Sequence, residues 1–251
     1  MAIKPNLSYQ IEIPLKDEKN ENCCALTYFE IGPMREDMRL KLSNKILMQI
    51  IDEPFFNDLR TQQQLGYVVF SRDFQTRDIL GNQLLVQSSL KSCEYLVSCI
   101  NKFLIDIREK FKNLTDEEFE TAKKSVHTVL AEKDINLGKD KIRMWRELFS
   151  HKYDFHRQEH DLQVLATITK KDVQDLFERT FFSENTKRID FELTSKHHAA
   201  CHTEWEEKNK EDPIFKTMNR VKVTQTYQEF KAACEVHPNV YKENYIARYQ
   251  Q

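Results

Sequence analysis

Hydrophobic and polar residues alternate along two stretches near the N-terminus, residues 7–14 (LSYQIEIP) and 24–31 (CALTYFEI). A period of two residues is typical of a β-strand with one buried face. The polar residues between the two stretches indicate a turn. The apolar stretches 67–70 and 82–89 predict a second pair of strands across a polar connection, and residues 188–193 (RIDFEL) predict a fifth strand.

Between these strands the apolar residues recur every three or four positions, which is the spacing of an amphipathic α-helix. The first helix is expected from residue 35 to the region of Leu59, with a kink or a restart at Pro54 and an end at Gly66. Its apolar stripe consists of Met38, Leu42, Ile46, Leu47, Ile50 and Ile51.

Further helices are expected near residues 96–107, after a capping box at 115–118 (TDEE), at about 138–150, and at 169–182 behind a threonine cap. The segment HRQEH is expected to begin another helix. This order of elements predicts an α+β fold, a sheet with helices packed on one side.

The chain is expected to divide into a folded domain, a linker and a tail. Residues 1–202 form the domain, the strongly charged residues 203–220 an exposed polar linker, and residues 221–251 a C-terminal tail. The tail contains a short predicted helix near 228–234. Three tyrosines spaced by four residues follow it, Tyr241, Tyr245 and Tyr249. Such spacing makes one aromatic stripe on a helix, which we expect to pack back on the domain.

Composition narrows the class of protein. Of the 251 residues, 31% are charged, yet the formal net charge is only -2, so no basic excess indicates a nucleic-acid partner. No apolar run has the length of a membrane span, and the first residues do not resemble a signal peptide. The six cysteines show no CxxC spacing, which favours reduced thiols and a cytoplasmic location.

The motif HRQEH at 156–160 matches the inverted zinc-peptidase signature. On a helix, His156 and His160 would share one face, and Glu159 would lie beside them to take a proton from metal-bound water. A catalytic zinc needs three protein ligands and a sheltered pocket. The motif instead follows a charged loop, and the apolar residues after it point elsewhere. We therefore interpret it as an exposed helix start that mimics a zinc site.

A second histidine cluster, HHAACH at 197–202, contains His197, His198, Cys201 and His202. It follows the last predicted strand. Cys/His-rich tracts bind metals, but we expect this one to hold no more than adventitious zinc or nickel.

Four segments carry a resemblance to a known family. The run EPFFNDLRTQQQLGY at 53–67 resembles the C-terminal half of insulin-degrading-enzyme-like, pitrilysin-type zinc metallopeptidases. NLTDEEFETAKKSV (113–126), YDFHRQEHDLQVLATITKKDVQDLF (153–177) and TYQEFKAACEVHP (226–238) are similar to further family segments. HRQEH falls inside the third of these, where the family pattern has no histidines.

The resemblance implies a fold and a position within a larger enzyme. Family members contain four homologous α+β domains, two in each half, and the halves close around a peptide. This chain resembles the fourth domain, with a mixed, mostly antiparallel sheet. The zinc motif of the family lies in the N-terminal half, so the resemblance implies no cofactor in this chain and zinc in a partner half.

The resemblance also implies two site residues. In the family's fourth domain an arginine and a tyrosine seven residues apart contribute to the active site, and Arg60 and Tyr67 stand at those positions. Arg60 would bind a substrate carbonyl and Tyr67 would stabilise the tetrahedral oxyanion. Their residue types suit these roles, because a guanidinium offers a fixed fork of donors and a phenol donates to an alkoxide. Taken alone, Arg60 could equally be a solvated helix residue and Tyr67 a strand core residue.

The expected function is thus that of the zinc-free half of a peptidase, inactive alone, with peptides as substrates and possible self-association through an uncovered face. Two alternatives remain: an inactive peptide-binding or partner-binding module of the same fold, and a stand-alone zinc enzyme that uses HRQEH. The sequence does not identify the peptide substrate.

Overall fold

The computed structural model describes residues 3–5, 7–34, 37–76, 78–133, 135–149, 153–198, 220–223 and 229–230. Within them the chain runs in the order β1 (Leu7–Pro14), β2 (Cys23–Pro33), α1 (Met38–Phe56), η1 (Asn57–Gln62), β3 (Val69–Thr76), β4 (Ile79–Ser88), α2 (Cys93–Lys112), α3 (Asp116–Ala131), α4 (Leu137–Phe149), α5 (Arg157–Thr167), α6 (Lys170–Phe181), β5 (Lys187–Thr194), η2 (Lys196–His198) and β6 (Arg220–Lys222).

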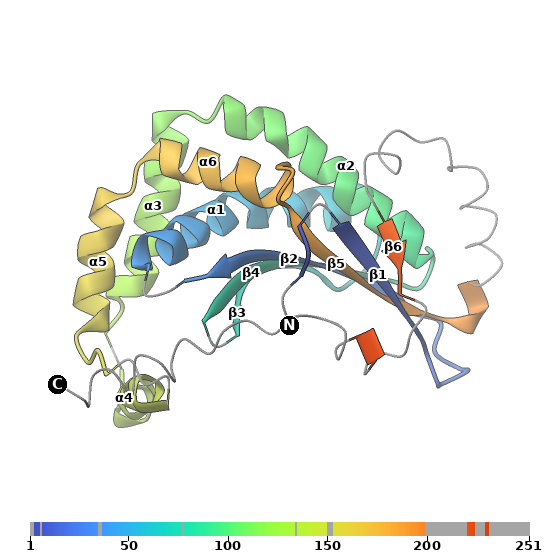
Figure 1. Ribbon diagram of the computed structural model, residues 1–251, viewed down its shortest axis with the longest axis horizontal. Helices are drawn as coiled ribbons and strands as arrows, with labels where there is room; N and C mark the ends of the chain where they lie inside the picture. Colours follow the sequence, from blue (N-terminus) through green and yellow to red (C-terminus); the bar gives the residue numbers. More distant parts are fainter. Residues whose placement is uncertain are drawn as a thin grey trace.

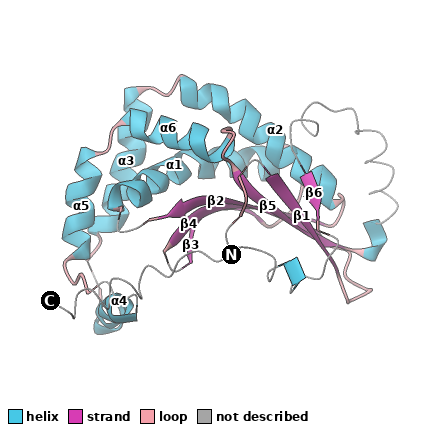
Figure 2. Cartoon of the chain, viewed as in Figure 1, coloured by secondary structure: helices cyan, strands magenta, loops and turns pink. Residues whose placement is uncertain are grey.

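The described strands form one sheet in the order β3-β4-β2-β5-β1-β6 (Figures 1 and 2). The pairs β3·β4, β2·β4 and β2·β5 are antiparallel, whereas β1·β5 and β1·β6 are parallel. The sheet is therefore mixed and mostly antiparallel, as predicted. Helices α1, α2 and α6 lie along one face of it, with α3 and α5 beside α1 (Figure 1), which confirms the α+β prediction.

A large apolar core fills the space between the sheet and the helical layer. Three aromatic pairs join its elements. Phe29 of β2 meets Phe181 of α6 edge-on at 4.8 Å between ring centroids. The other two pairs are Phe55–Phe103 and Phe111–Phe177, at 5.1 and 4.0 Å. Pairs at these distances add about 0.5–1.5 kcal/mol each beyond the area that they bury.

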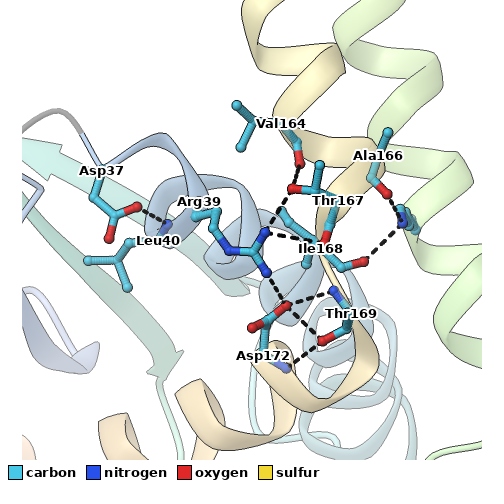
Figure 3. A network of polar contacts seen from close by, with 10 residues as sticks. Asp37, Arg39, Leu40, Val164, Ala166, Thr167, Ile168, Thr169 and Asp172 are labelled. Carbon is cyan, nitrogen blue, oxygen red and sulfur yellow. Dashed lines mark hydrogen bonds and ion pairs between the residues drawn. The ribbon is translucent and has the colours of Figure 1, made fainter.

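The start of α1 is tied to the end of α5 by a network around Arg39 (Figure 3). The guanidinium of Arg39 donates to the backbone and side-chain oxygens of Thr167 and to Asp172 Oδ2, the last at 2.6 Å. Asp172 also completes a capping box with Thr169 at the start of α6. Because Arg39 and Asp172 are partly exposed, the ion pair itself contributes only about 1 kcal/mol or less. Its geometric role is to hold α1, α5 and α6 in register.

Helix α1 continues through Pro54, so the restart expected there is not observed. The helix runs through this residue to Phe56 and continues into a π-helical turn, η1. Proline inside a helix costs about 3 kcal/mol through its missing N–H and its steric clash. Ile51 and Phe55, both fully buried around it, hold the helix against the core and offset that cost.

The second strand pair is also longer than predicted. The residues between 70 and 82, expected to form a polar connection, are mostly strand, and the antiparallel ladder extends from Val69↔Val86 to Thr76↔Ile79. Polar side chains of this stretch have partners within the chain: Ser71 donates to Asp52, Arg72 donates to Gln83, and Asp73 accepts from Lys45. The polar composition of residues 71–81 predicted a loop, although most of their backbone pairs in the β3·β4 ladder.

Parts of the tail contact the face of the sheet opposite the helices. Phe230 is buried beside Tyr9 of β1, with 5.2 Å between ring centroids, in a small cluster with Ile3, Ile11 and Ile189. Arg220, the last residue of the expected linker, begins β6. The rest of the expected linker and the tyrosine stripe lie outside the described residues.

Candidate functional site

The connection between α1 and β3 is held by two buried leucines. Leu59 in η1 and Leu65 after it both belong to the main core. The Leu65 N–H donates to the Leu59 carbonyl at 3.0 Å, and the Gln63 N–H donates to the Asp58 carbonyl at 2.9 Å. Such wide turns are typical of π-helical segments, which are frequent at functional sites. The connection is thus a rigid loop rather than a loose one.

Gly66 was predicted to end the helix, and this is wrong. The helical segment ends at Gln62, and the residue with positive φ is Gln64, at 50°. Gly66 is required for a different reason: a Cβ atom on it would lie 1.8 Å from the carbonyl oxygen of Gln87 in β4. The absence of a side chain lets the backbone before β3 lie directly on β4. This contact fixes the position of the next residue, Tyr67.

Arg60 and Tyr67 lie together. The guanidinium carbon of Arg60 is 4.6 Å from the centre of the Tyr67 ring and 4.7 Å from the centre of the Phe56 ring. Arg60 is therefore held between two aromatic side chains by cation–π contacts, each about 0.5–1 kcal/mol at an exposed site. Tyr67 precedes β3 and is 82% exposed, which excludes the alternative that it is a strand core residue.

The polar atoms of both side chains remain available. Among the described residues, no hydrogen bond or ion pair involves the Arg60 guanidinium or the Tyr67 hydroxyl. Contacts to ring faces do not consume the N–H donors at the edge of a guanidinium. The arrangement can therefore present several fixed donors and one phenolic donor on the same exposed rim, the chemistry that binding a carbonyl or an oxyanion requires.

Phe56 was not identified as part of this site from the sequence. It lies four residues before Arg60, so both project from the same side of the helical segment. The sequence could have indicated this role, because an aromatic residue one helical turn before Arg60 can contact its side chain. Its position outside the core, at 39% exposure, sets it apart from its buried neighbour Phe55.

HRQEH lies on the surface with its histidines directed to separate partners. His156 is the N-cap residue of α5 rather than part of the helix. Its Nδ1 lies 3.0 Å from Glu159, while Nδ1 of His160 lies 3.1 Å from Asp154. The side chains of His156 and His160 are 74% and 57% exposed. Each imidazole thus pairs with a different carboxylate, so the geometry does not provide a sheltered ligand set.

The second histidine cluster has a structural use. His198 is buried, and its Nε2 lies 3.0 Å from both the Glu21 and the Ser89 carbonyl oxygens. His197 Nε2 lies 2.8 Å from the Glu18 carbonyl. These contacts fasten η2 to the neighbouring loops. The remaining members of the cluster, Cys201 and His202, lie outside the described residues.

A cavity of about 570 Å³ opens between α1, α3, α4 and α5. Two of its ion pairs lie within the chain: Lys41 Nζ lies 3.3 Å from Asp161, and Arg157 donates to Glu147 at 2.7 Å. Burial lowers the pKa of Lys41.

In the part of the chain that the structure describes, no group of three or more His, Cys, Asp or Glu residues could hold a metal ion. Nor does any described helix have the length and apolar character needed to cross a membrane.

Helix α4 is set apart from the helical layer and exposes its apolar residues (Figure 1). Its one buried residue is an acid, Glu147. Trp145 and Phe149 meet edge-on at 5.1 Å and are 57% and 69% exposed. We define the α4 surface as Ile135, Leu137, Ile142, Trp145, Leu148, Phe149, Tyr153 and Phe155. Five of these eight residues lie on α4 and three in the adjoining connections, and exposed apolar surface of this extent is typical of a site that another molecule covers.

Comparison with known sequences relates the chain to the C-terminal part of larger peptidases. Residues 46–145 match the family model described as PQQ synthase PqqF-like, C-terminal lobe domain 4. The protein mug138 of Schizosaccharomyces pombe, which carries the name of a zinc protease, is 32% identical over 192 residues, 76% of this chain and 19% of that protein. Human insulin-degrading enzyme is 32% identical over 160 residues, 63% of this chain and 15% of that enzyme.

Comparison with solved structures gives the same fold. Pitrilysin matches with a TM-score of 0.68 and 19% sequence identity, over 79% of this chain and 21% of that chain. The chain therefore spans less than a quarter of the length of these relatives.

Proposed function

Because the chain belongs to the pitrilysin-type metallopeptidase family and corresponds to its C-terminal part, we propose that it is the zinc-free part of a two-part peptidase. It encloses and positions peptide substrates and stabilises the transition state, and it is inactive alone. Zinc belongs to the N-terminal partner half, where it supplies an activated water. The described residues of this chain offer no ligand set for it.

The observation that supports this proposal best is the position of Arg60 between Phe56 and Tyr67. A substrate-binding arginine must be ordered before the substrate arrives, since each immobilised side chain costs about 0.5–1.5 kcal/mol on binding. The two rings impose that order on Arg60 while leaving its donors unused. We assign to Arg60 the binding of a substrate carbonyl.

Tyr67 takes the second role in this proposal. Its hydroxyl donates a hydrogen bond to the oxygen that becomes negative when the peptide carbonyl is attacked. A neutral donor suits this role beside Arg60, because a second full charge would repel the guanidinium. The Gly66–Gln87 contact holds the backbone from which Tyr67 projects, so the phenol need not be reoriented during the reaction.

The proposal is tested with this chain reconstituted with a zinc-bearing N-terminal half from a family member and a quenched fluorogenic peptide. Tyr67→Phe is expected to lower kcat about a hundredfold with little change in KM, because an oxyanion donor acts mainly in the transition state. Arg60→Ala is expected to lower kcat and raise KM. Tyr95→Phe, which removes a phenol from α2 where the tyrosine ring also lies against a cation, Lys91, serves as the matched control. A Tyr67→Phe enzyme with kcat within twofold of the parent would refute the oxyanion role.

The same proteins and peptide assay distinguish the proposal from its two alternatives, an inactive binding module and a stand-alone zinc enzyme. A binding module of this fold would bind peptide, yet Arg60 and Tyr67 variants would leave the turnover of the reconstituted enzyme unchanged. A stand-alone zinc enzyme would cleave peptide without the partner half, and both a chelator and His156→Ala would abolish that activity. We expect the isolated chain to show no turnover with added zinc.

We further propose that the α4 surface contacts the partner half. It contains eight of the large hydrophobic residues that are exposed among the described residues, and obligate interfaces are more apolar than ordinary surface. A cytoplasmic location is part of the same proposal. It is supported by four described cysteines that are all free, Cys23, Cys24, Cys93 and Cys99.

A further inference from the structure

Two fully buried thiols meet where three elements come together. Cys23 is the first residue of β2 and Cys93 is the first residue of α2. Both are 0% exposed and neither is in a disulfide. The end of β5 passes beside them: the Ser195 N–H donates to Cys23 Sγ at 3.4 Å, and Cys93 Sγ lies 3.2 Å from the Leu193 carbonyl oxygen. The two sulfur atoms are thus held against residues 193–195, and the one proton of the Cys93 thiol is shared between that carbonyl and Cys23.

The electrostatics of the pair are unequal. The hydrogen bond from Cys93 lowers the pKa of Cys23 to about 6, assisted by the Ser195 N–H and by the nearby His198. The same hydrogen bond, together with burial, raises the pKa of Cys93. Of the two, Cys23 is therefore the one that becomes a thiolate. A thiolate is the nucleophilic form of cysteine, and a second thiol in contact with it is the usual arrangement of a reactive dithiol.

Two short connections lead into the pair: residues 20–22 precede Cys23, and residues 89–92 precede Cys93. The imidazole Nε2 of His198 lies 3.0 Å from both the Glu21 and the Ser89 carbonyl oxygens and so joins the two connections. The exposed residues Glu21 and Lys91 lie in these connections. His198, together with Ser195, whose Oγ donates to the Asn20 carbonyl, holds these connections. A hydroperoxide reaches the buried pair through a local opening of them.

We propose that Cys23 and Cys93 form a redox site that a hydroperoxide converts reversibly into a disulfide. The Cys23 thiolate attacks one peroxide oxygen, so that an S–O bond forms, the O–O bond breaks and the leaving hydroxide or alkoxide takes up a proton. Cys93 then attacks the sulfur of the resulting sulfenic acid. The S–S bond forms, the S–O bond breaks, and the hydroxide leaves as water with the Cys93 proton. The pair loses two electrons and the peroxide gains them.

The disulfide would join the start of β2 to the start of α2 and close a loop of about seventy residues. It therefore links the sheet to the helical layer on the side where η2 is attached. This inference does not depend on the proposed function, because it concerns the reactivity of the chain itself.

The test is peptide mapping of the folded 251-residue chain after treatment with a small excess of hydrogen peroxide. Remaining thiols are alkylated, and the digest is analysed by mass spectrometry without reduction. We expect a Cys23–Cys93 cross-linked peptide as the main product, lost on treatment with dithiothreitol. Cys99→Ser, which removes another buried thiol, is the matched control and should leave the product unchanged. Cys93→Ser should abolish it and leave a sulfenic acid on Cys23 that dimedone traps.

Several results would overturn the inference. Cys23 and Cys93 could stay free in the folded chain and cross-link only in urea. Cys23 could instead pair with Cys24, or with Cys201 or Cys234, which lie outside the described residues. Because the mapping is done on the unmodified chain, a variant that fails to fold does not affect these outcomes.

Discussion

Replacing Gly66 by alanine tests whether the backbone contact with β4 positions the Arg60–Tyr67 site. A Cβ atom at this position would lie 1.8 Å from the Gln87 carbonyl oxygen and 2.9 Å from its carbonyl carbon. Both atoms are backbone, in a strand paired with β2 and β3. No side-chain rotation can relieve the overlap, so the loop that carries Tyr67 must move.

The size of the effect follows from that overlap. An ordinary contact of a Cβ atom with a carbonyl oxygen is at least about 3.2 Å, so residue 66 must move by more than 1 Å. Overpacking of a well-filled site costs about 1–3 kcal/mol. Loss of the 2.9 Å hydrogen bond from the Gln87 N–H to the Val68 carbonyl adds about 1 kcal/mol. We expect Gly66→Ala to lower the free energy of unfolding by about 2–4 kcal/mol.

Turnover should fall as well, because misplacing a catalytic group by about 1 Å costs about a hundredfold in rate. Urea unfolding of the chain measures the loss of stability, and kcat of the reconstituted peptidase measures the loss of turnover. Gly138→Ala is the control, since a Cβ there meets only the Asn136 side chain, at 3.1 Å in an exposed helical turn. Surface substitutions usually change the free energy of unfolding by less than about 0.5 kcal/mol. A Gly66→Ala chain whose free energy of unfolding differs from that of the parent by no more than this would refute the steric argument.

Periodicity and capping chemistry identified most helices and strands because both are local. The capping box of Thr115 with Glu118 and the threonine cap at Thr169 stand where the sequence placed them. Strand order could not be predicted in this way. The parallel pairing of β1 with β5 joins residues 7–14 to 187–194, and no local pattern specifies a partner so distant in the chain.

The site was only partly predictable, for a related reason. The resemblance supplied Arg60 and Tyr67, and the structure brings them into contact. The need for glycine at position 66 depends on the backbone of Gln87 in another strand, which the sequence around Gly66 does not reveal. The apolar spacing around Trp145 predicted a helix, but an amphipathic helix looks the same in sequence whether its apolar face is buried or, as in α4, exposed.

Two further predictions concern surfaces outside the Arg60 site. Phe230→Ala should destabilise the chain by roughly 3 kcal/mol, since it removes a buried ring from the cluster around Tyr9. For a chain of this size that lowers Tm by about 6–12 °C in calorimetry, and deletion of residues 221–251 should lower it at least as far. An unchanged Tm would mean that the tail does not stabilise the domain. The isolated chain should self-associate through the α4 surface, because no other part of the described chain covers it. Trp145→Asp places a charge at its centre and should shift sedimentation velocity profiles towards monomer, whereas Leu90→Asp, at an exposed turn 73% accessible, should not. A parent chain that remains monomeric at high concentration, or equal effects of the two substitutions, would show that the α4 surface is not the site of association. It would also remove the main support for contact between α4 and the partner half.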